Sequence, residues 1–257
     1  ADRAGLHGAC REGQPGSPGN LRYRDGDQGM IRMYLIRHGS TPGNREHQYI
    51  GRTEEDLCEE GILALKGQEA PEVQRIYASP MRRCIQTAKI LYPGRAPVKI
   101  EEFRECDFGS FEGKNYQDLS GDPVYQAWID SGGTLGFPGG EEPGGFRRRC
   151  VEGFDKVLED CRRDGIETAA LIVHGGTIMS IMEAYARPKG SYYDFQVGNG
   201  EGYELVITDD GAGTCGICPG SSAGGPGMAL SSGAADRASD RKGRKNYQKM
   251  SAKDQRR

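Results

Sequence analysis

Residues 33–39 read Met-Tyr-Leu-Ile-Arg-His-Gly, an apolar run that ends in a cation, an imidazole and a glycine. Short apolar runs bounded by turn residues are typical of buried strands, so we predict a strand over residues 31–36. Ligands of open α/β sheets bind just beyond the carboxyl ends of such strands. We therefore expect Arg37 and His38 at the rim of a sheet, where Gly39 lets the backbone turn sharply.

The same pattern occurs a second time along the chain. Residues 169–173 read Ala-Ala-Leu-Ile-Val and are followed by His174, Gly175, Gly176 and Thr177. The chain has four histidines, and two of them close an apolar segment and precede glycine. A single polar strand end is an ordinary feature, whereas two of the same kind indicate that His38 and His174 belong to one site.

The segments between these two strands alternate in their periodicity. Further strands are predicted over residues 73–78, 98–100 and 203–208. Helical patterns cover residues 59–69, 122–129, 146–161 and 178–185, and another helix follows Ser79 and Pro80, which we expect as its N-cap and first residue. Strands that alternate with helices predict an α/β fold, a three-layer α/β/α sandwich with a mainly parallel central sheet.

The composition of the two ends differs from that of the middle. The mean hydropathy of -0.68 is low for a globular chain, and residues 1–29 and 210–257 carry no apolar periodicity. Such segments bury too little apolar area to offset the entropy of ordering. We therefore predict a disordered extension over residues 1–29, one catalytic domain over residues 30–209 and a disordered tail over residues 210–257, with Met30 a candidate for the natural start.

Charge and cysteine content narrow the choice of partners and compartment. The net charge is -3, yet residues 235–257 hold nine Lys or Arg against three Asp or Glu. We interpret this basic tail, and the arginines at 147–149, as solvated surface, and expect no nucleic-acid partner. The eight cysteines come without an apolar signal segment, so a disulfide framework is poorly supported. With no run of 18 apolar residues we expect no membrane span and a cytoplasmic protein.

Several chemistries can be set aside from the motifs. The chain has no phosphate-binding Gly-x-x-x-x-Gly-Lys-Ser/Thr loop, no dinucleotide glycine fingerprint after a strand and no Gly-x-Ser-x-Gly elbow. Its histidines lack metal-ligand spacing, so we expect neither a metal nor a cofactor. What remains is two histidines and several arginines near strand ends, together with a loop of carboxylates. Arginine forks and glycine-rich helix starts bind phosphate oxygens, and an imidazole can attack phosphorus.

Four motifs, in this order, resemble those of the histidine phosphatase superfamily, the phosphoglycerate-mutase-like group. They are Leu-Ile-Arg-His-Gly-Ser-Thr at 35–41 with Asn44, Ser-Pro-Met-Arg-Arg-Cys-Ile-Gln-Thr-Ala at 79–88, Phe-Arg-Glu at 103–105 with Phe-Gly at 108–109 and Glu-Gly at 112–113, and Val-His-Gly-Gly at 173–176. The resemblance spans residues 30–209, and the combination makes it specific.

The resemblance implies a role for each matched residue. His38 would be the nucleophile that becomes phosphohistidine, and Glu105 the proton donor to the leaving oxygen. Two arginines compete in the second motif, and the spacing of the family selects Arg83 over Arg82. The substrate phosphate would then be bound by Arg37, Asn44, Arg83, His174 and the backbone of Gly175. Phosphoryl transfer depends mainly on positioning and charge stabilisation, so this pocket needs no metal.

The proton donor has rivals within the acidic loops. Asp107, Glu112 and Glu141 are further carboxylates that could take the role given to Glu105. A general acid should have a raised pKa, through burial or neighbouring charge.

Within the family, the short distance from Glu105 to His174 and the Phe-Gly-Ser-Phe-Glu-Gly-Lys stretch at 108–114 resemble the phosphatase branch, especially α-ribazole phosphatases of cobalamin assembly. The expected partner is a small-molecule phosphate ester. Ser40 and Glu142 depart from the pattern of many relatives and leave the substrate contacts open. A phosphoglycerate mutase and a non-catalytic phosphate-binding module are the alternatives, and the oligomeric state stays open.

Overall fold

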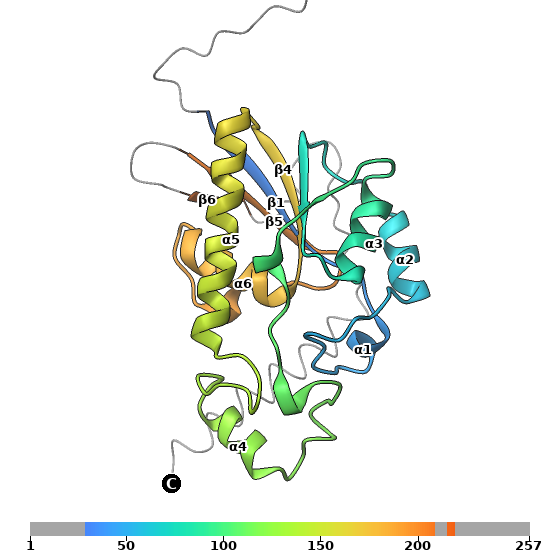
Figure 1. The fold of residues 1–257 in the computed structure, drawn as a ribbon, viewed down its shortest axis with the longest axis vertical. Coiled ribbons are helices and arrows are strands. Elements are labelled where there is room, and N and C mark those ends of the chain that lie inside the picture. The colour runs from blue at the N-terminus through green and yellow to red at the C-terminus, as the bar shows by residue number, and fades with distance from the viewer. Residues whose placement is uncertain (1–28, 209–214, 219–257) are drawn as a thin grey trace, which may run out of the picture.

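The computed structural model describes residues 29–208 and 215–218, whose fold is shown in Figure 1. Within them, six strands form one sheet in the order β3-β2-β4-β1-β5-β6. Parallel pairing joins β3, β2, β4 and β1, while β5 and β6 are antiparallel to their neighbours. The strands are β1 (Ile31–Arg37), β2 (Arg75–Ala78), β3 (Val98–Lys99), β4 (Thr168–Val173), β5 (Gly202–Ile207) and β6 (Cys215–Cys218).

Alternate residues of the central strands pack into two separate cores. Met33 and Leu35 of β1 contribute to one core with Leu171 of β4, while Ile36 and Ile172 contribute to the other. All five side chains are buried. A parallel sheet buried on both faces explains why residues 33–36 and 169–173 read as continuous apolar runs rather than as an alternation.

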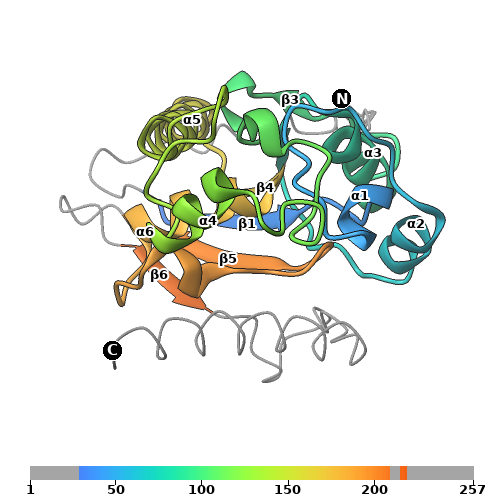
Figure 2. The ribbon, with the colours of Figure 1, turned by 90° about the horizontal axis from the view of Figure 1, so that it is seen from below.

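Helices cover both faces of this sheet. The longer helices are α2 (Glu59–Lys66), α3 (Arg82–Leu91), α5 (Pro143–Asp164) and α6 (Gly175–Tyr185). Phe154 and Leu158 of α5 and Ile178 of α6 belong to the first core, and Cys84 and Ala88 of α3 belong to the second. Figure 2 shows α5 and α6 on one side of the strands and α2 and α3 on the other. The predicted three-layer α/β/α architecture is therefore confirmed.

One helix begins later than predicted. Ser79 and Pro80 do not form the N-terminus of α3, which begins at Arg82 with Met81 as an N-cap that makes no side-chain hydrogen bond. The Ser79 hydroxyl lies 2.8 Å from Nε2 of the His174 ring and accepts a longer hydrogen bond, of 3.4 Å, from the amide of Met81. The side chain that the local pattern assigned to a cap therefore makes its shorter contact with a residue distant in sequence.

After β3 and η1 (Glu101–Phe103), the chain that leads to α5 lies beyond the carboxyl ends of β1 and β4 (Figures 1 and 2). It contains η2 (Gly109–Phe111) and α4 (Pro123–Asp130), whose N-cap Asp122 accepts a hydrogen bond from the amide of Val124. Six aromatic side chains pack against one another and stabilise residues 104–142. They are Tyr49, Phe108, Phe111, Tyr125, Trp128 and Phe137.

Two short elements complete the described chain, α1 (Pro42–Arg45) and η3 (Tyr192–Phe195). Strand β6 falls inside the stretch 210–257 that the sequence analysis assigns to a tail, so the sheet extends past the boundary predicted at residue 209. The rest of that tail and nearly all of the N-terminal extension lie outside the described residues. No helix in the described part of the chain combines the length and apolar character needed to cross a membrane.

Candidate active site

His38 follows β1 and is almost completely buried, with 3% of its surface exposed. Its backbone N–H continues the pairing of β1 with β4 by donating to the carbonyl of Val173 at 2.9 Å. The ring Nδ1 lies 2.7 Å from the carbonyl oxygen of Gly39. A carbonyl only accepts hydrogen bonds, so Nδ1 carries the proton of the neutral ring. The lone pair is then on Nε2, which is therefore the ring nitrogen that can act as a nucleophile.

His174 occupies the equivalent position after β4, as the N-cap of α6. Its side chain is fully buried, and its Nε2 lies 2.8 Å from the hydroxyl of Ser79. The ring centroids of His38 and His174 are 5.2 Å apart with an edge-on arrangement. The two histidines that the sequence singles out are thus neighbours in space.

Arg83 is the buried arginine of α3, with 1% of its surface exposed. Its guanidinium donates to the carbonyls of Thr53 and Gly51, each at 2.9 Å. The side chain of Arg82 is 56% exposed and pairs with Glu54 and Asp56 at the surface. Burial therefore separates the two arginines that compete in the sequence.

Arg37 is anchored by a hydrogen bond from Nη1 to the carbonyl of Val197 at 2.7 Å. A methyl group added at Gly175 would lie 3.5 Å from its Nε, so the guanidinium lies against the first turn of α6. The N–H groups at the start of α6, the positive end of its helix dipole and the charge of Arg37 therefore lie together, where they can all stabilise one anion.

Burial, together with the neighbouring arginines, keeps both histidines neutral. Burial, followed by the charges of Arg83 and Arg37, holds the pKa of His38 well below its ordinary value. Burial, followed by the charge of Arg83 and the His38 ring, does the same to the pKa of His174. A neutral His38 is the form that can attack an electrophile.

Glu105 follows η1, and its carboxylate reaches the same helix start. Its Oε1 accepts a hydrogen bond from the amide of Cys106 at 3.0 Å, and a methyl group added at Gly176 would lie 2.9 Å from that oxygen. Burial raises the pKa of Glu105, against the opposing effect of this hydrogen bond and of nearby arginines. A carboxyl with a raised pKa can hold the proton that a general acid must deliver.

The three rival carboxylates are each engaged elsewhere. Both Gly51 and Thr53 donate their amides to Glu112 at 2.9 Å, so this carboxylate holds the loop that binds Arg83. Asp107 pairs with Arg52 and accepts the amide of Gly109. Glu141 forms a bidentate pair with Arg149. Among the described residues, the amide of Cys106 is the only donor to Glu105.

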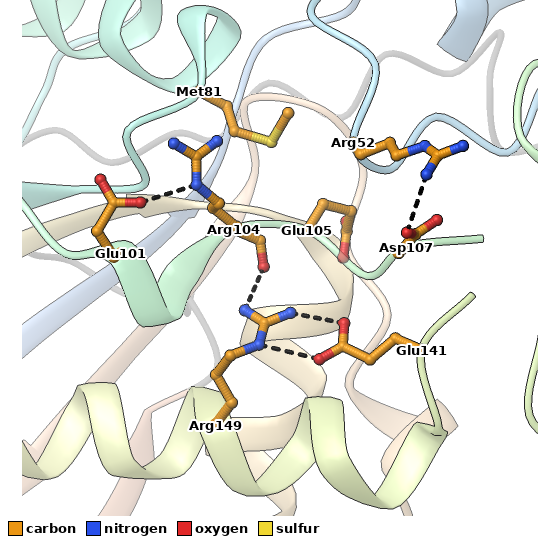
Figure 3. A pocket seen from close by; sticks show the side chains of 8 residues that line it. All are labelled: Arg52, Met81, Glu101, Arg104, Glu105, Asp107, Glu141 and Arg149. Carbon is orange, nitrogen blue, oxygen red and sulfur yellow. Dashed lines mark hydrogen bonds and ion pairs between the residues drawn. The ribbon is translucent and has the colours of Figure 1, made fainter. Parts of the chain in front are cut away.

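A cavity of about 270 Å³ lies beside Glu105 (Figure 3). Three ion pairs line it together with Met81 and Glu105. The pairs are Arg52–Asp107 at 3.3 Å, Arg104–Glu101 at 2.8 Å and Arg149–Glu141 at 2.7 Å. The charged side chains of the wall next to Glu105 are therefore paired with one another.

Asn44 lies in α1, and its side-chain oxygen accepts hydrogen bonds from Asn199 at 3.0 Å and from the amide of Thr41 at 3.3 Å. The same Asn199 nitrogen lies 3.1 Å from the carbonyl of His38. Asn199 therefore connects Asn44 to the backbone of the histidine.

Sequence reasoning missed three polar residues that hold the site. Asn199 binds the His38 carbonyl, Ser79 binds the His174 ring, and Thr87 accepts the amide of Gly39 at 3.0 Å. Ser79 and Thr87 lie inside a quoted motif, but nothing in the local pattern distinguishes their contacts. Arg149 was also misread as solvated surface, since it is partly buried and faces the cavity, whereas Arg148 is exposed.

Known proteins with similar sequences include phosphatases. It is 30% identical over 183 residues to the adenosylcobalamin/alpha-ribazole phosphatase of Salmonella typhimurium, a match that covers 66% of this chain and 87% of that protein. It is 30% identical over 161 residues to a Hydrogenobacter thermophilus protein provisionally named phosphoserine phosphatase 2, over 60% of this chain and 77% of that one.

Solved structures share the fold. The alpha-ribazole phosphatase of Shigella flexneri superposes with a TM-score of 0.63 at 22% identity, over 73% of this chain and 95% of that one. A phosphoglycerate mutase of Thermus thermophilus superposes with a TM-score of 0.52 at 26% identity, over 72% and 96% of the two chains. Residues 33–215 match the family model of the histidine phosphatase superfamily, branch 1, and the chain therefore belongs to this superfamily.

Proposed function

We propose that this protein is a phosphomonoesterase that works through a phosphohistidine at His38. The observation that carries the proposal is the hydrogen bond from Nδ1 to the Gly39 carbonyl, which leaves the Nε2 lone pair on a buried, neutral imidazole next to His174 and close to the charges of Arg83 and Arg37. A nucleophile and anion-stabilising groups at one point are what in-line phosphoryl transfer requires.

In the first step, His38 Nε2 attacks phosphorus and the bond from phosphorus to the ester oxygen breaks. Glu105, protonated at the start, transfers its proton to that leaving oxygen. Arg37, Arg83, His174, Asn44 and the amide of Gly175 bind the phosphoryl oxygens. These groups stabilise the charge that accumulates in the transition state, and no metal enters either step.

In the second step, the Glu105 carboxylate takes a proton from water. The oxygen of that water attacks phosphorus, the phosphorus–nitrogen bond breaks, and inorganic phosphate leaves. One carboxyl thus serves as acid and then as base, which returns the enzyme to its starting state.

The substrate that we favour is α-ribazole 5'-phosphate, or another small phosphate ester accepted by a broad-specificity enzyme. The Salmonella typhimurium relative, whose name includes alpha-ribazole phosphatase, supports this choice because the match covers 87% of that protein. We also propose a cytoplasmic location. A panel of α-ribazole 5'-phosphate, O-phosphoserine and 3-phosphoglycerate, compared by kcat/KM, identifies the preferred leaving group.

The test of the mechanism is hydrolysis of 4-nitrophenyl phosphate in a chelator. We expect turnover to be unchanged by the chelator and to fall at least about a thousand-fold in His38→Ala, because the covalent intermediate is lost. Brief reaction with labelled substrate should label the wild-type chain and not the variant. Undiminished turnover by His38→Ala would overturn the mechanism, and a rate that rises only after priming with a bisphosphorylated sugar acid would indicate a mutase.

A further inference from the structure

Glu141 and Arg149 form the most enclosed ion pair of the cavity wall (Figure 3). The Arg149 Nε and Nη2 atoms donate to the two carboxylate oxygens of Glu141 at 3.0 and 2.7 Å. Their side chains are 26% and 25% exposed. A bidentate pair of this kind fixes orientation as well as distance, because two parallel hydrogen bonds define a plane.

The remaining contacts of the pair lie on the two sides of Glu105. Arg149 Nη1 donates to the carbonyls of Glu102 and Arg104, at 2.7 and 2.8 Å. The amide of Glu141 donates to the carbonyl of Asp107 at 2.9 Å. The backbone immediately before Glu105 is thus bound to α5, and the backbone after it is bound to the loop that precedes α5.

We propose that Glu141 and Arg149 are a positioning pair that holds the Glu105 carboxyl against the start of α6 and balances the charge on that side of it. The inference rests on the proposed role of Glu105 as proton donor. Neither residue touches the reacting atoms, so both would act through Glu105. The chain needs such a device because Glu105 lies on a loop, and loops position side chains less rigidly than helices or strands do.

The charges that face Glu105 come from several elements. Arg37 comes from β1, Arg83 from α3 and Arg149 from α5, and all three oppose the effect of burial on the Glu105 pKa. The thiols of Cys84, Cys106 and Cys150, the phenol of Tyr192 and the ring of His174 are further titratable groups around it, and all are uncharged at neutral pH. The cavity wall also holds the pairs Arg52–Asp107 and Arg104–Glu101, each with one positive and one negative charge. Glu141, beside Arg149, adds a compensating negative charge. Removing one partner of this pair therefore changes the electrostatic potential at Glu105. Loss of Glu141 makes this potential more positive, and loss of Arg149 makes it more negative.

Four variants separate two contributions of the pair. One is its charge, and the other is the set of hydrogen bonds that joins Arg149 to Glu141 and to the backbone around Glu105, which we call the tether. Glu141→Gln keeps the shape of the pair but leaves Arg149 uncompensated, so the Glu105 pKa falls. Arg149→Met leaves Glu141 unpaired, so the Glu105 pKa rises. Arg149→Lys keeps the charge and loses the fork. The double variant Glu141→Gln/Arg149→Met removes both charges, so the net charge of the pair stays zero while the tether is lost.

The measurement is kcat/KM against pH for two substrates, an alkyl phosphate and 4-nitrophenyl phosphate. A required acid makes kcat/KM fall as pH rises through its pKa. We expect this basic limb to move to lower pH in Glu141→Gln and to higher pH in Arg149→Met. It should stay near the wild-type position in Arg149→Lys and in the double variant.

Loss of the tether is measured separately, by comparing kcat/KM for substrates with different leaving groups. 4-Nitrophenolate departs with little protonation, whereas an alkoxide needs the proton. Arg149→Lys should therefore lose on the order of 10- to 100-fold in kcat/KM for the alkyl phosphate, a loss typical of a misplaced catalytic group, and much less for 4-nitrophenyl phosphate. A merely structural role would lower kcat/KM for both substrates by a similar factor and would leave the pH of the basic limb unchanged.

Arg148→Met is the matched control, since Arg148 is the exposed neighbour on the same helix. It should leave the limb and the substrate ratio unchanged, and thermal melts of all variants identify any that fail to fold. Arg149→Lys keeps the charge and Glu141→Gln keeps the shape of the pair, so these two variants serve if Arg149→Met does not fold. Basic limbs of Glu141→Gln and Arg149→Met that coincide, or that move in the same direction, overturn the inference. Failure of the proposed function would show separately, as turnover that survives His38→Ala.

Discussion

His38, His174, Arg37 and Arg83 bring up to four positive charges into one cluster of largely buried side chains. Both imidazoles stay neutral in the resting protein because their pKa values are held down by burial and by the arginines. A bound phosphoryl dianion changes this balance, since its negative charge favours the protonated form of His174. Substrate would thus prepare the donor that stabilises its own transition state.

These two histidines predict how stability depends on pH. A histidine whose folded pKa lies below its ordinary value of 6.5 binds more protons when unfolded, so stability falls as pH drops below that value. Each contributes up to about 1.4 kcal/mol per pH unit. Glu105 has the opposite sign, because its raised folded pKa makes the folded state bind more protons above 4.5. With two histidines against one carboxyl, the net result is lower stability at lower pH.

Urea denaturation between about pH 7.5 and about pH 5.5 measures this slope, in a range where carboxylates with lowered pKa such as Asp160 stay ionised. The slope should be steeper in Glu105→Gln, which lacks the opposing carboxyl. It should be shallower in His174→Asn, which lacks one histidine. A stability independent of pH in the wild type would contradict the depressed histidine pKa values.

At the same scale, the sequence predicts some site residues and not others for a physical reason. His38, His174, Arg83 and Glu105 stand in motifs with fixed spacing to a strand end or a helix start, and the structure gathers them around the start of α6. Asn199 has no such signature, because its amide reaches His38 only through the folding of a distant loop. The roles of all these residues stay predictions until the variants are measured.

At the scale of elements, helix α2 packs its first turn directly onto the loop after His38. A methyl group added at Gly61 would lie 2.4 Å from the backbone oxygen of Ser40, which leaves no room for a side chain. This contact keeps the loop that follows the candidate nucleophile against α2.

Gly61→Ala should therefore destabilise the protein, although alanine favours a helix over glycine by about 1 kcal/mol. Gly67→Ala, at the end of the same helix, is the matched control. Its nearest atoms would lie 3.7 Å away and its φ is -86°, so alanine fits there without strain. Thermal melts of the two variants compare them, and a Gly61→Ala protein as stable as Gly67→Ala would contradict the close packing of α2 on Ser40.

Element boundaries were harder to predict than elements. Apolar runs mark β1, β4 and α5, because a strand or helix that faces a core must be apolar along that face. The start of α3 was placed wrongly because Ser79 had two possible partners, the backbone of its own helix and His174. Local propensity describes only the first of these.

At the scale of the whole molecule, the candidate site connects segments that are distant in sequence. Arg37 and His38 follow β1, Arg83 comes from α3, His174 begins α6 and Glu105 lies on the loop between them. An anion bound by Arg37, Arg83 and His174 would cross-link three of these segments in the folded state only.

Inorganic phosphate should accordingly raise the melting temperature. At a concentration of 100 times its Kd, the gain is about 2.7 kcal/mol of unfolding free energy. Arg83→Gln should lose most of this gain, while Arg82→Gln should keep it, because Arg82 pairs with surface carboxylates. Calorimetric melts in phosphate and in chloride of equal ionic strength make the comparison. An equal gain in both variants would show that phosphate binds elsewhere.

The layered architecture was predictable from the alternation of apolar strands and amphipathic helices, whereas the neighbour order of the strands was not. The order β3-β2-β4-β1-β5-β6 depends on which strand edges meet after distant segments have packed, and β6 follows a glycine-rich stretch with no apolar periodicity. Such pairing leaves little trace in the local pattern.

The central place of β1 in the sheet has a consequence for biosynthesis. Both of its neighbours, β4 and β5, are made much later, since Arg32 pairs with Thr168 on one side and Val206 on the other. While the ribosome is still translating the middle of the chain, the apolar segment from Ile31 to Ile36 has no native strand beside it. Contacts this distant in sequence slow folding, and the exposed strand is a natural binding site for chaperones on the nascent chain.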